Sequence, residues 1–239
     1  VELSKIKNIE KQVYEEVKSS NPEIIDSINN TGQLDEEVEK KLKEIGANFE
    51  VLDNEQLIEK TALELSNGKA VGWFQGRMEF GPRALGCRSI LGDARSEHMQ
   101  KTLNRKVKYR ESFRPFAPSI IREDLSKWFE LDCDSPYMLL VADVHKSVRK
   151  EMTNEEKKLF GIDRLNIKRS NVPAITHVDY SARIQTVHED TNPKYYKLLQ
   201  KFKKITNCPI REVLEAAHIL RHSISGINHS SNGILLRSD

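Results

Sequence analysis

Two stretches of the sequence, residues 76–95 and 107–119, are rich in the residue types that bind anions. The first intersperses four arginines with four glycines: Arg77, Arg83, Arg88 and Arg95 with Gly76, Gly81, Gly86 and Gly92. The second reads VKYRESFRPFAPS and supplies Lys108, Arg110 and Arg114. Arginine presents a planar fork of donors that suits a phosphate, and glycine lets backbone N–H groups approach an anion closely. Together the two stretches predict a phosphate-binding site.

Cationic and apolar side chains alternate over residues 107–110. In an extended segment, side chains two positions apart share one face, so Lys108 and Arg110 would point together. Val107 and Tyr109 would then face the core of the protein. This alternation predicts a two-pronged grip on an anion, carried by a strand.

A structural alternative exists for each arginine taken singly, because nearby acids could neutralise it. Glu79, Asp93 and Glu111 are the candidate partners. For one arginine this ion pair is the better interpretation, whereas the whole cluster, with its glycines and few acids, favours an anionic ligand. Neither GxxxxGK[ST] nor GxGxxG occurs in the sequence, so the expected phosphate site is of another type.

The composition limits the classes of protein to consider. The chain has 239 residues, with 38 Lys+Arg against 36 Asp+Glu, which suffices for one large domain or two small ones. A net charge of +2 argues against a general nucleic-acid or membrane-surface partner. No apolar run approaches the length of a membrane span, and no signal-peptide core precedes the first helix. Three cysteines without a CxxC pair indicate a reducing, cytoplasmic setting.

Helical and strand patterns alternate along the chain. Helical spacing occurs over residues 2–18, 35–45, 53–68, 96–103, 124–129 and 193–205. Strand patterns occur over residues 48–52, 69–76, 136–144 and 173–187, where the last reads as two strands or one bent strand. Residues 76–95 look rich in loops, and residues 146–170 read as a charged insertion or mobile loop. The alternation predicts an α/β or α+β sheet domain.

Two helix starts are marked clearly. Asp53 with Gln56 forms a capping-box pattern, and Gly68 is placed to end that helix. Asn192-Pro193 predicts a second start. The apolar residues expected on its buried face are Tyr195, Leu198, Phe202 and Ile205.

Several long motifs resemble the C-terminal, YrdC-like domain of the O-carbamoyltransferase family. They are GWFQGRMEFGPRALGCRSILGDAR, KYRESFRPFAPSI, SPYMLLVADV, PAITHVDYSARIQTV and NPKYYKLLQKF, in the family's order. The resemblance implies a YrdC-like domain over residues 35–210, in which helices flank a twisted mixed sheet. A helical segment over residues 1–34 would precede it, and residues 211–239 would form a separate tail.

The resemblance also implies an activity. In this family the domain activates carbamoyl phosphate with ATP to give carbamoyl-adenylate, and Mg²⁺ accompanies the triphosphate. A separate metal-dependent N-terminal domain then passes the carbamoyl group to a hydroxyl. Residues 1–50 are too few to supply that domain, so we expect it on a longer or separate chain. By itself, the chain would hold only the adenylate-forming part.

Matching the motifs residue by residue assigns roles to six positions. The residues implied to hold the phosphates of carbamoyl phosphate and ATP are Arg83, Lys108, Arg110 and Arg114. Among them, Lys108 and Arg110 match the K-x-R half of a catalytic signature. His177 and Arg183 would line the nucleotide side, although His177 reads equally well as a packed, hydrogen-bonded histidine near a strand end.

The tail departs from the family pattern, because the expected NTSFN turn does not follow the last helix. Instead, EAAHILRHS and SSNGILLRSD resemble part of an HNH endonuclease. That resemblance implies His218 as general base and Asn232 as orienting residue. The near-neutral charge lacks the basic footprint of a DNA-binding protein. The alternatives are therefore a nucleotide- or phosphate-binding module without turnover, a nuclease fragment, or a tail that merely completes the sheet.

Overall fold

The computed structural model describes three continuous parts of the chain, residues 49–79, 81–105 and 111–215, with backbone alone over 211–215. It also describes isolated positions before them, which are Glu15, Lys18, Ser19, Ser20, Pro22, Glu36, Lys40, Lys43 and Glu44. The helices expected over 2–18 and 35–45 fall largely outside the described residues. Four predicted site residues, Lys108, Arg110, His218 and Asn232, also fall outside them.

The chain divides into two compact units. One comprises Val1–Leu52, Gly76–Met78 and Ala217–Ile234, and the other comprises Asp53–Gln75, Glu79–Ala216 and Leu235–Asp239. In the first unit, residues 49–52 adopt no regular structure, so the strand expected over 48–52 is wrong in its described part. Val51 there is 64% exposed, which shows that its side chain does not pack on a sheet.

The second unit is built on a five-stranded sheet with the strand order β1-β2-β7-β3-β6. Its strands are β1 (Val71–Phe74), β2 (Arg88–Asp93), β3 (Ala117–Ile121), β6 (Gln185–Val187) and β7 (Ile210–Glu215). β3 and β6 run parallel, whereas β1–β2, β2–β7 and β7–β3 are antiparallel pairs. A separate antiparallel pair joins β4 (Val141–Asp143) to β5 (Ser181–Arg183). The mixed α/β, or α+β, class predicted from the sequence is confirmed.

β2 corrects the expectation that residues 76–95 are mainly loop. Every residue of β2 is buried, and the strand pairs with β1 on one edge and β7 on the other. A strand buried on both faces lacks the alternation of apolar and polar residues that marks a half-buried strand. Charged residues at its two ends, Arg88 and Asp93, also made the strand hard to recognise from the sequence. Both side chains have their polar partners inside the protein.

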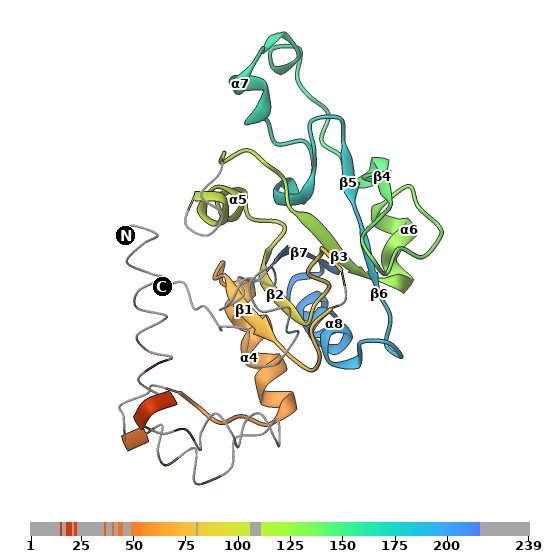
Figure 1. Ribbon diagram of the computed structural model, residues 1–239. Coiled ribbons are helices and arrows are strands. Elements are labelled where there is room, and N and C mark those ends of the chain that lie inside the picture. The colour runs from red at the N-terminus through yellow and green to blue at the C-terminus, as the bar shows by residue number, and fades with distance from the viewer. Residues whose placement is uncertain are drawn as a thin grey trace. The chain divides into compact units, whose positions relative to one another are not determined.

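Two long helices, α4 (Asn54–Ser66) and α8 (Pro193–Thr206), pack side by side against the sheet (Figure 1). The capping box of α4 is confirmed. Asp53 Oδ1 accepts a hydrogen bond from the Gln56 backbone N–H at 2.8 Å, and the Gln56 side chain accepts from the Asp53 N–H at 3.2 Å. Asn67 ends the helix and Gly68 follows with φ 77°, a left-handed value that favours glycine.

The predicted start of α8 is also confirmed. Pro193 occupies its first turn and the Asn192 side chain accepts a hydrogen bond from the Tyr195 N–H. Tyr195, Leu198 and Phe202 are fully buried on its inner face, as the spacing predicts. Ile205 is 42% exposed, so it does not share that face.

Short helices connect the remaining strands. They are α5 (Glu97–Leu103), η2 (Arg122–Asp124), α6 (Leu125–Trp128), η3 (Lys146–Val148), η4 (Glu156–Lys158), α7 (Ile162–Leu165) and η5 (Pro173–Ile175). Ser96 caps α5 as expected. Of the strand expected over 136–144, only β4 forms. The first half of 173–187 contains no strand: it begins with the 3-10 turn η5, where Pro173 removes a backbone donor, and continues without regular structure to residue 180.

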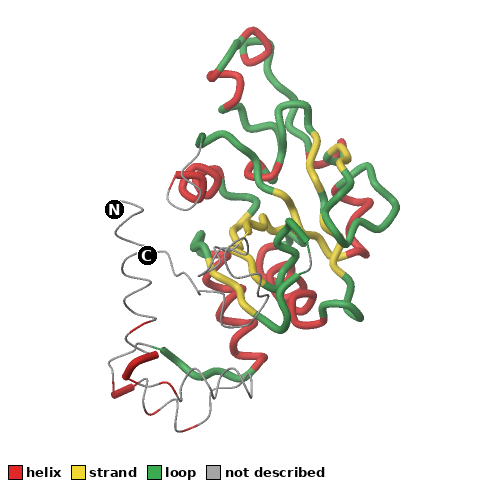
Figure 2. The backbone as a smooth tube through the Cα atoms, viewed as in Figure 1, coloured by secondary structure: helices red, strands yellow, loops and turns green. Residues whose placement is uncertain are grey.

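The segment around α7 lies at the top of both backbone views, away from the five-stranded sheet (Figures 1 and 2). It belongs to the charged stretch 146–170 that was expected as an insertion, and short helices interrupt its loops. In the described part of the chain, no helix has the length and apolar character needed to cross a lipid bilayer.

Candidate functional site

A loop over residues 79–88 carries Arg83 and is folded around one carboxylate. Glu79 Oε1 accepts hydrogen bonds from the backbone N–H groups of Leu85 at 2.8 Å, Cys87 at 2.6 Å and Arg88 at 3.3 Å. Hydrogen bonds from several N–H groups to one ionised oxygen are strong and directional. Glu79 therefore organises the loop instead of neutralising an arginine in an ion pair.

The side chains of two glutamines connect the same loop to the sheet and to α8 through hydrogen bonds. Gln185 Nε2 donates to the Leu85 carbonyl at 2.8 Å. Gln75 Nε2 donates to the Gly86 carbonyl at 3.0 Å and to Asn192 Oδ1, at the start of α8, at 2.7 Å. These bonds join segments that are far apart in the sequence, so the position of the loop is set by the assembled fold.

Gly86 brings the loop close to α8. Its φ is 101°, and a Cβ at this position would lie 2.4 Å from Cδ1 of the buried Tyr195 ring. No larger side chain fits here without displacing the ring, because a carbon–carbon contact of that length lies well inside van der Waals distance. Gly86 therefore allows the loop that carries Arg83 to pack closely against α8.

Replacing Glu79 by alanine should loosen this loop. We expect Glu79→Ala to lower the free energy of unfolding by about 1–3 kcal/mol, because partly buried N–H groups lose a charged acceptor. Glu79→Gln keeps one acceptor oxygen and should lie between wild type and Glu79→Ala. Urea unfolding of the three proteins measures the order, and equal stabilities would show that the loop does not depend on the carboxylate.

Arg83 and Arg183 lie near each other although 99 intervening residues separate them in the sequence. Burial lowers the pKa of the Arg183 guanidinium, and the neighbouring Arg83 cation lowers this pKa further. Arg83 Nε is buried, and none of the described residues accepts a hydrogen bond from it. Neither arginine forms an ion pair with a carboxylate of the described residues. Two adjacent cations that no described carboxylate neutralises create a local field that favours an anion.

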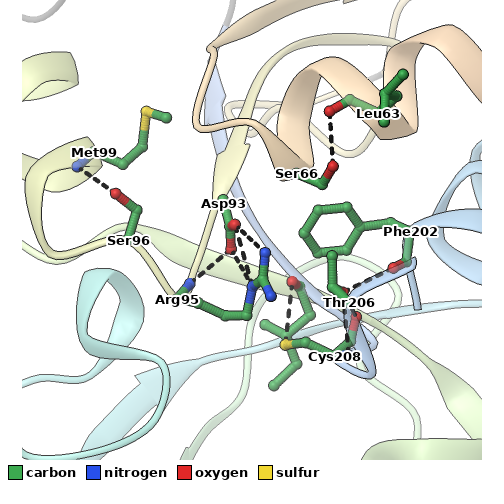
Figure 3. Close-up of polar contacts among 10 residues, drawn as sticks. Leu63, Ser66, Asp93, Arg95, Ser96, Met99, Phe202, Thr206 and Cys208 are labelled. Atoms are coloured by element: carbon green, nitrogen blue, oxygen red, sulfur yellow. Dashed lines mark hydrogen bonds and ion pairs between the residues drawn. The ribbon is translucent and has the colours of Figure 1, made fainter. Parts of the chain in front are cut away.

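The other arginines of the first stretch have structural partners where they are described. Arg88 is 3% exposed, donates to the carbonyls of Gln75 and Cys87, and stacks on Phe74 with 3.3 Å from its guanidinium carbon to the ring centroid. Figure 3 shows Arg95 bound through two nitrogens to the buried Asp93 carboxylate, with 2.7 Å between Nη2 and Oδ2. Arg95 therefore forms the ion pair expected as the structural alternative, whereas Arg88 is held by backbone carbonyls and an aromatic ring instead of an acid.

Arg114 and His177 line a different feature, a cavity of about 340 Å³. Its walls come from α5 and from residues 112–115, 165–169 and 173–178. Arg83 and Arg183 are not among the described residues that line it. The structure therefore divides the described members of the predicted site into two groups, an arginine pair and a cavity.

The segment that carries Arg114 is held by α5 and by the residue that follows it. Asn104 is fully buried, and its Nδ2 donates to the carbonyls of Ser112 at 3.2 Å and Arg114 at 2.9 Å. Gln100 Nε2 donates to the Phe113 carbonyl at 2.9 Å. The Arg114 side chain itself is exposed and pairs with Glu111 at 3.1 Å. An ion pair this exposed is weak, so Arg114 can exchange Glu111 for a ligand.

His177 is fixed by a neighbouring carboxylate. Its Nδ1 lies 3.0 Å from Asp179 Oδ1, and the same oxygen accepts hydrogen bonds from the Ser181 N–H at 3.0 Å and the Ser181 hydroxyl at 2.6 Å. The Ser181 donors, followed by His177, lower the pKa of Asp179 from 3.8 to about 2. The carboxylate therefore stays ionised and directs Nε2 of the His177 ring away from itself.

This carboxylate should make stability depend on acid pH. A carboxyl whose pKa is lower in the folded state contributes stability above its unfolded pKa of 3.8, and that contribution disappears as the pH falls to about 2. We expect Asp179→Asn to be less stable than wild type at pH 6, by under about 1 kcal/mol because the side chain is exposed. The difference should vanish near pH 2 in urea unfolding. A difference that stays constant with pH would contradict this assignment.

Several positioning residues were missed by sequence reasoning. Glu79, Asn104 and Gln185 act through backbone groups and through contacts distant in sequence, and no local pattern marks them. The GPRALGCRS motif did contain a usable signal, since Gly81 and Gly86 both take positive φ values around Arg83. Among the described residues, no group of three or more His, Cys, Asp or Glu side chains is placed to hold a metal ion.

Comparison with known proteins assigns the class. Residues 62–213 match the family described as Carbamoyltransferase C-terminus, which covers most of the chain, so the chain belongs to that family. This confirms the resemblance expected from the motifs. Residues 203–239 match the family described as HNH endonuclease, in agreement with the resemblance of the tail.

The relatives that match this region include proteins named for a function and one named as uncharacterized. The chain is 57% identical over 177 residues to an uncharacterized protein of Synechocystis sp., covering 73% of this chain and 29% of that protein. It is 39% identical over 175 residues to nodulation protein NolO of Bradyrhizobium diazoefficiens, covering 72% and 28%. It is 43% identical over 138 residues to the 3'-hydroxymethylcephem-O-carbamoyltransferase of Streptomyces clavuligerus, covering 58% and 22%. The chain thus spans less than a third of these relatives' lengths.

Proposed function

We propose that this chain is the carbamoyl-activating part of an O-carbamoyltransferase and forms carbamoyl-adenylate from carbamoyl phosphate and ATP. The observation that carries the proposal is the adjacent pair Arg83 and Arg183, whose cations have no carboxylate partner among the described residues. Membership of the carbamoyltransferase family supplies the carbamoyl chemistry. A doubly cationic pair matches the dianionic phosphate of carbamoyl phosphate.

The reaction balances with one water. Water cleaves carbamoyl phosphate into carbamate and inorganic phosphate, and a carbamate oxygen then attacks the α-phosphorus of ATP. A new P–O bond forms, the bond from the α-phosphorus to the bridging oxygen breaks, and pyrophosphate leaves. Catalysis of such steps consists mostly of positioning and charge stabilisation. Arg83 and Arg183 would hold the donor phosphate, and Mg²⁺ would enter coordinated to the triphosphate.

Transfer of the carbamoyl group to an acceptor would use a part of the protein outside the matched region. Relatives named as carbamoyltransferases are several times longer than the matched region, which leaves room for a metal-dependent transfer domain that selects the acceptor hydroxyl. We place that domain on a longer or separate chain. The cysteines Cys87, Cys133 and Cys208 form no disulfide, which fits a reducing cytoplasmic compartment.

The test is isotope exchange between pyrophosphate and ATP catalysed by this chain. If the chain forms the adenylate reversibly, labelled pyrophosphate should enter ATP only when carbamoyl phosphate is present. Exchange that is equally fast without carbamoyl phosphate, or absent with it, would contradict the proposed reaction.

A second candidate function is a binding module that holds these ligands without turnover. It is favoured by one observation: the family match ends at residue 213, inside β7, whereas the HNH match already begins at residue 203. The turn that follows this strand in the family is therefore replaced. Binding of both ligands without any exchange would establish this second function.

A further inference from the structure

A buried polar pair lies in the five-stranded sheet beside the loop that carries Arg83. Ser119 in β3 and Gln185 in β6 are partners in the parallel pairing of these two strands. Ser119 is fully buried and Gln185 is 4% exposed. The Ser119 hydroxyl donates to Gln185 Oε1 at 2.5 Å, and Gln185 Nε2 donates to the Leu85 carbonyl at 2.8 Å. The serine therefore fixes the rotation of the amide that reaches the loop.

The stability of the sheet does not require this polar pair. Aliphatic side chains fill other buried positions of the same strands, as Ile120, Ile121 and Val187 show. Removing an amide and a hydroxyl from water costs free energy that their hydrogen bonds largely offset, so two apolar side chains of similar size would serve the core as well. What an apolar pair cannot supply is the hydrogen bond to the loop.

That hydrogen bond connects the two segments that carry the arginine pair. Gln185 follows Arg183 by two residues, and Leu85 follows Arg83 by two residues. The bond therefore joins the two segments at an equal and short distance along the chain from each arginine. Since burial and the Arg83 cation both lower the pKa of Arg183, the two cations repel each other, and a tie between their segments opposes that repulsion.

The internal fold of the loop is held independently of Gln185. Glu79 accepts hydrogen bonds from three of the loop's own N–H groups, and Gln75 joins the loop to Asn192 at the start of α8. Replacing Gln185 should therefore leave the loop folded. The change expected is in the position of the loop relative to the segment that carries Arg183.

We propose that Gln185, oriented by Ser119, is a positioning residue that holds Arg83 at a fixed spacing from Arg183 and thereby sets the affinity of the pair for a phosphate. The proposal deepens the proposed function, because it rests on the pair being the site of the carbamoyl phosphate phosphate group. Without this tie the two cations would separate, and one phosphate could no longer reach both guanidinium groups. Displacements of about 1 Å in such a site can cost up to about 100-fold.

The first test needs no ligand. It is a double-mutant cycle of Arg83→Gln and Arg183→Gln, measured by urea unfolding of the whole chain in two backgrounds. In the parent the two substitutions should be non-additive, because each removes the same repulsion. The second background combines Ser119→Ala with Gln185→Met, so that both polar partners become apolar and no buried hydroxyl is left unpaired. There the non-additivity should fall by at least about half.

The second test is calorimetric titration of the same background with carbamoyl phosphate. Affinity should fall about 10-fold while the urea midpoint stays close to that of the parent. Ser119→Ala alone keeps the amide but frees its rotation, so it should show both effects to a smaller extent. The matched control is Ser170→Ala, which removes a fully buried hydroxyl whose partners are Thr176 and the Val172 N–H. It should change neither the cycle nor the affinity.

The two tests separate this proposal from the proposed function. Equal non-additivity in both backgrounds would overturn the positioning role of Gln185, whatever the chain binds. Additive effects in the parent would overturn it as well, since there would be no coupled pair to position. If the non-additivity falls as expected but the parent does not bind carbamoyl phosphate, the positioning role stands and the proposed function fails.

Discussion

Replacing either arginine of the Arg83–Arg183 pair by glutamine should weaken carbamoyl phosphate binding about 10- to 100-fold and, at the same time, make the free protein more stable. The first effect follows from the loss of a charge-assisted hydrogen bond to the phosphate, worth about 1.5–3 kcal/mol. The second follows because burial, and after it the neighbouring Arg83 cation, lowers the pKa of the Arg183 guanidinium, so the charged pair costs stability in the free protein. Relief of that repulsion should raise the free energy of unfolding by about 0.5–1 kcal/mol.

This combination of effects distinguishes a ligand site from a structural ion pair. Calorimetric titration with carbamoyl phosphate and urea unfolding of the free protein measure the two quantities. Arg122→Gln is the matched control, because Arg122 pairs with Asp134 in the described structure. That substitution should not raise stability and should leave carbamoyl phosphate affinity unchanged. If Arg83→Gln instead destabilises the free protein without weakening binding, Arg83 has a structural role.

A chain that ends at Cys208 should fail to fold, whereas a chain that ends at Glu215 should fold. The first lacks β7, which lies between β2 and β3 at the centre of the five-stranded sheet. Removing a central strand separates the sheet into two parts and exposes backbone groups that would have no partner. Ile210, fully buried at the start of β7, would also be lost from the core.

Circular dichroism and urea unfolding measure this difference. The chain ending at Cys208 should show no cooperative transition, and the chain ending at Glu215 should show one. Cooperative unfolding of the shorter chain would contradict the placement of β7. The same pair of proteins tests the tail, because the HNH match begins within α8 and also includes β7, so its first part belongs to the sheet domain. A tail-dependent nuclease activity should be lost when residues 216–239 are removed.

Local signals predicted the ends of elements well. Asp53 and Asn192 cap helices through hydrogen bonds within three residues, so the sequence pattern alone identifies them. Prediction failed where the structure depends on burial in the folded protein, which the local sequence does not show. β2 was read as loop because its six residues are all buried and do not alternate, and Ile205 turned out exposed because α8 contacts the core only as far as Phe202.

The candidate site could be predicted only in part for the same reason. Glycine and arginine density in residues 76–95 pointed to Arg83, but the same density included Arg88 and Arg95, whose partners are structural. The proximity of Arg83 and Arg183 depends on how the folded loop and β5 approach each other. Lys108 and Arg110, the expected two-pronged grip, lie outside the described residues, so their role stays a prediction.

The most direct test of the central claim is a crystal structure of this chain with carbamoyl phosphate bound. The proposed site predicts phosphate oxygens within hydrogen-bond distance of both the Arg83 and the Arg183 guanidinium groups, with Arg83 Nε, now without a described acceptor, donating to one of them. Carbamoyl phosphate bound elsewhere, while the two guanidinium groups contact no ligand atom, would contradict it.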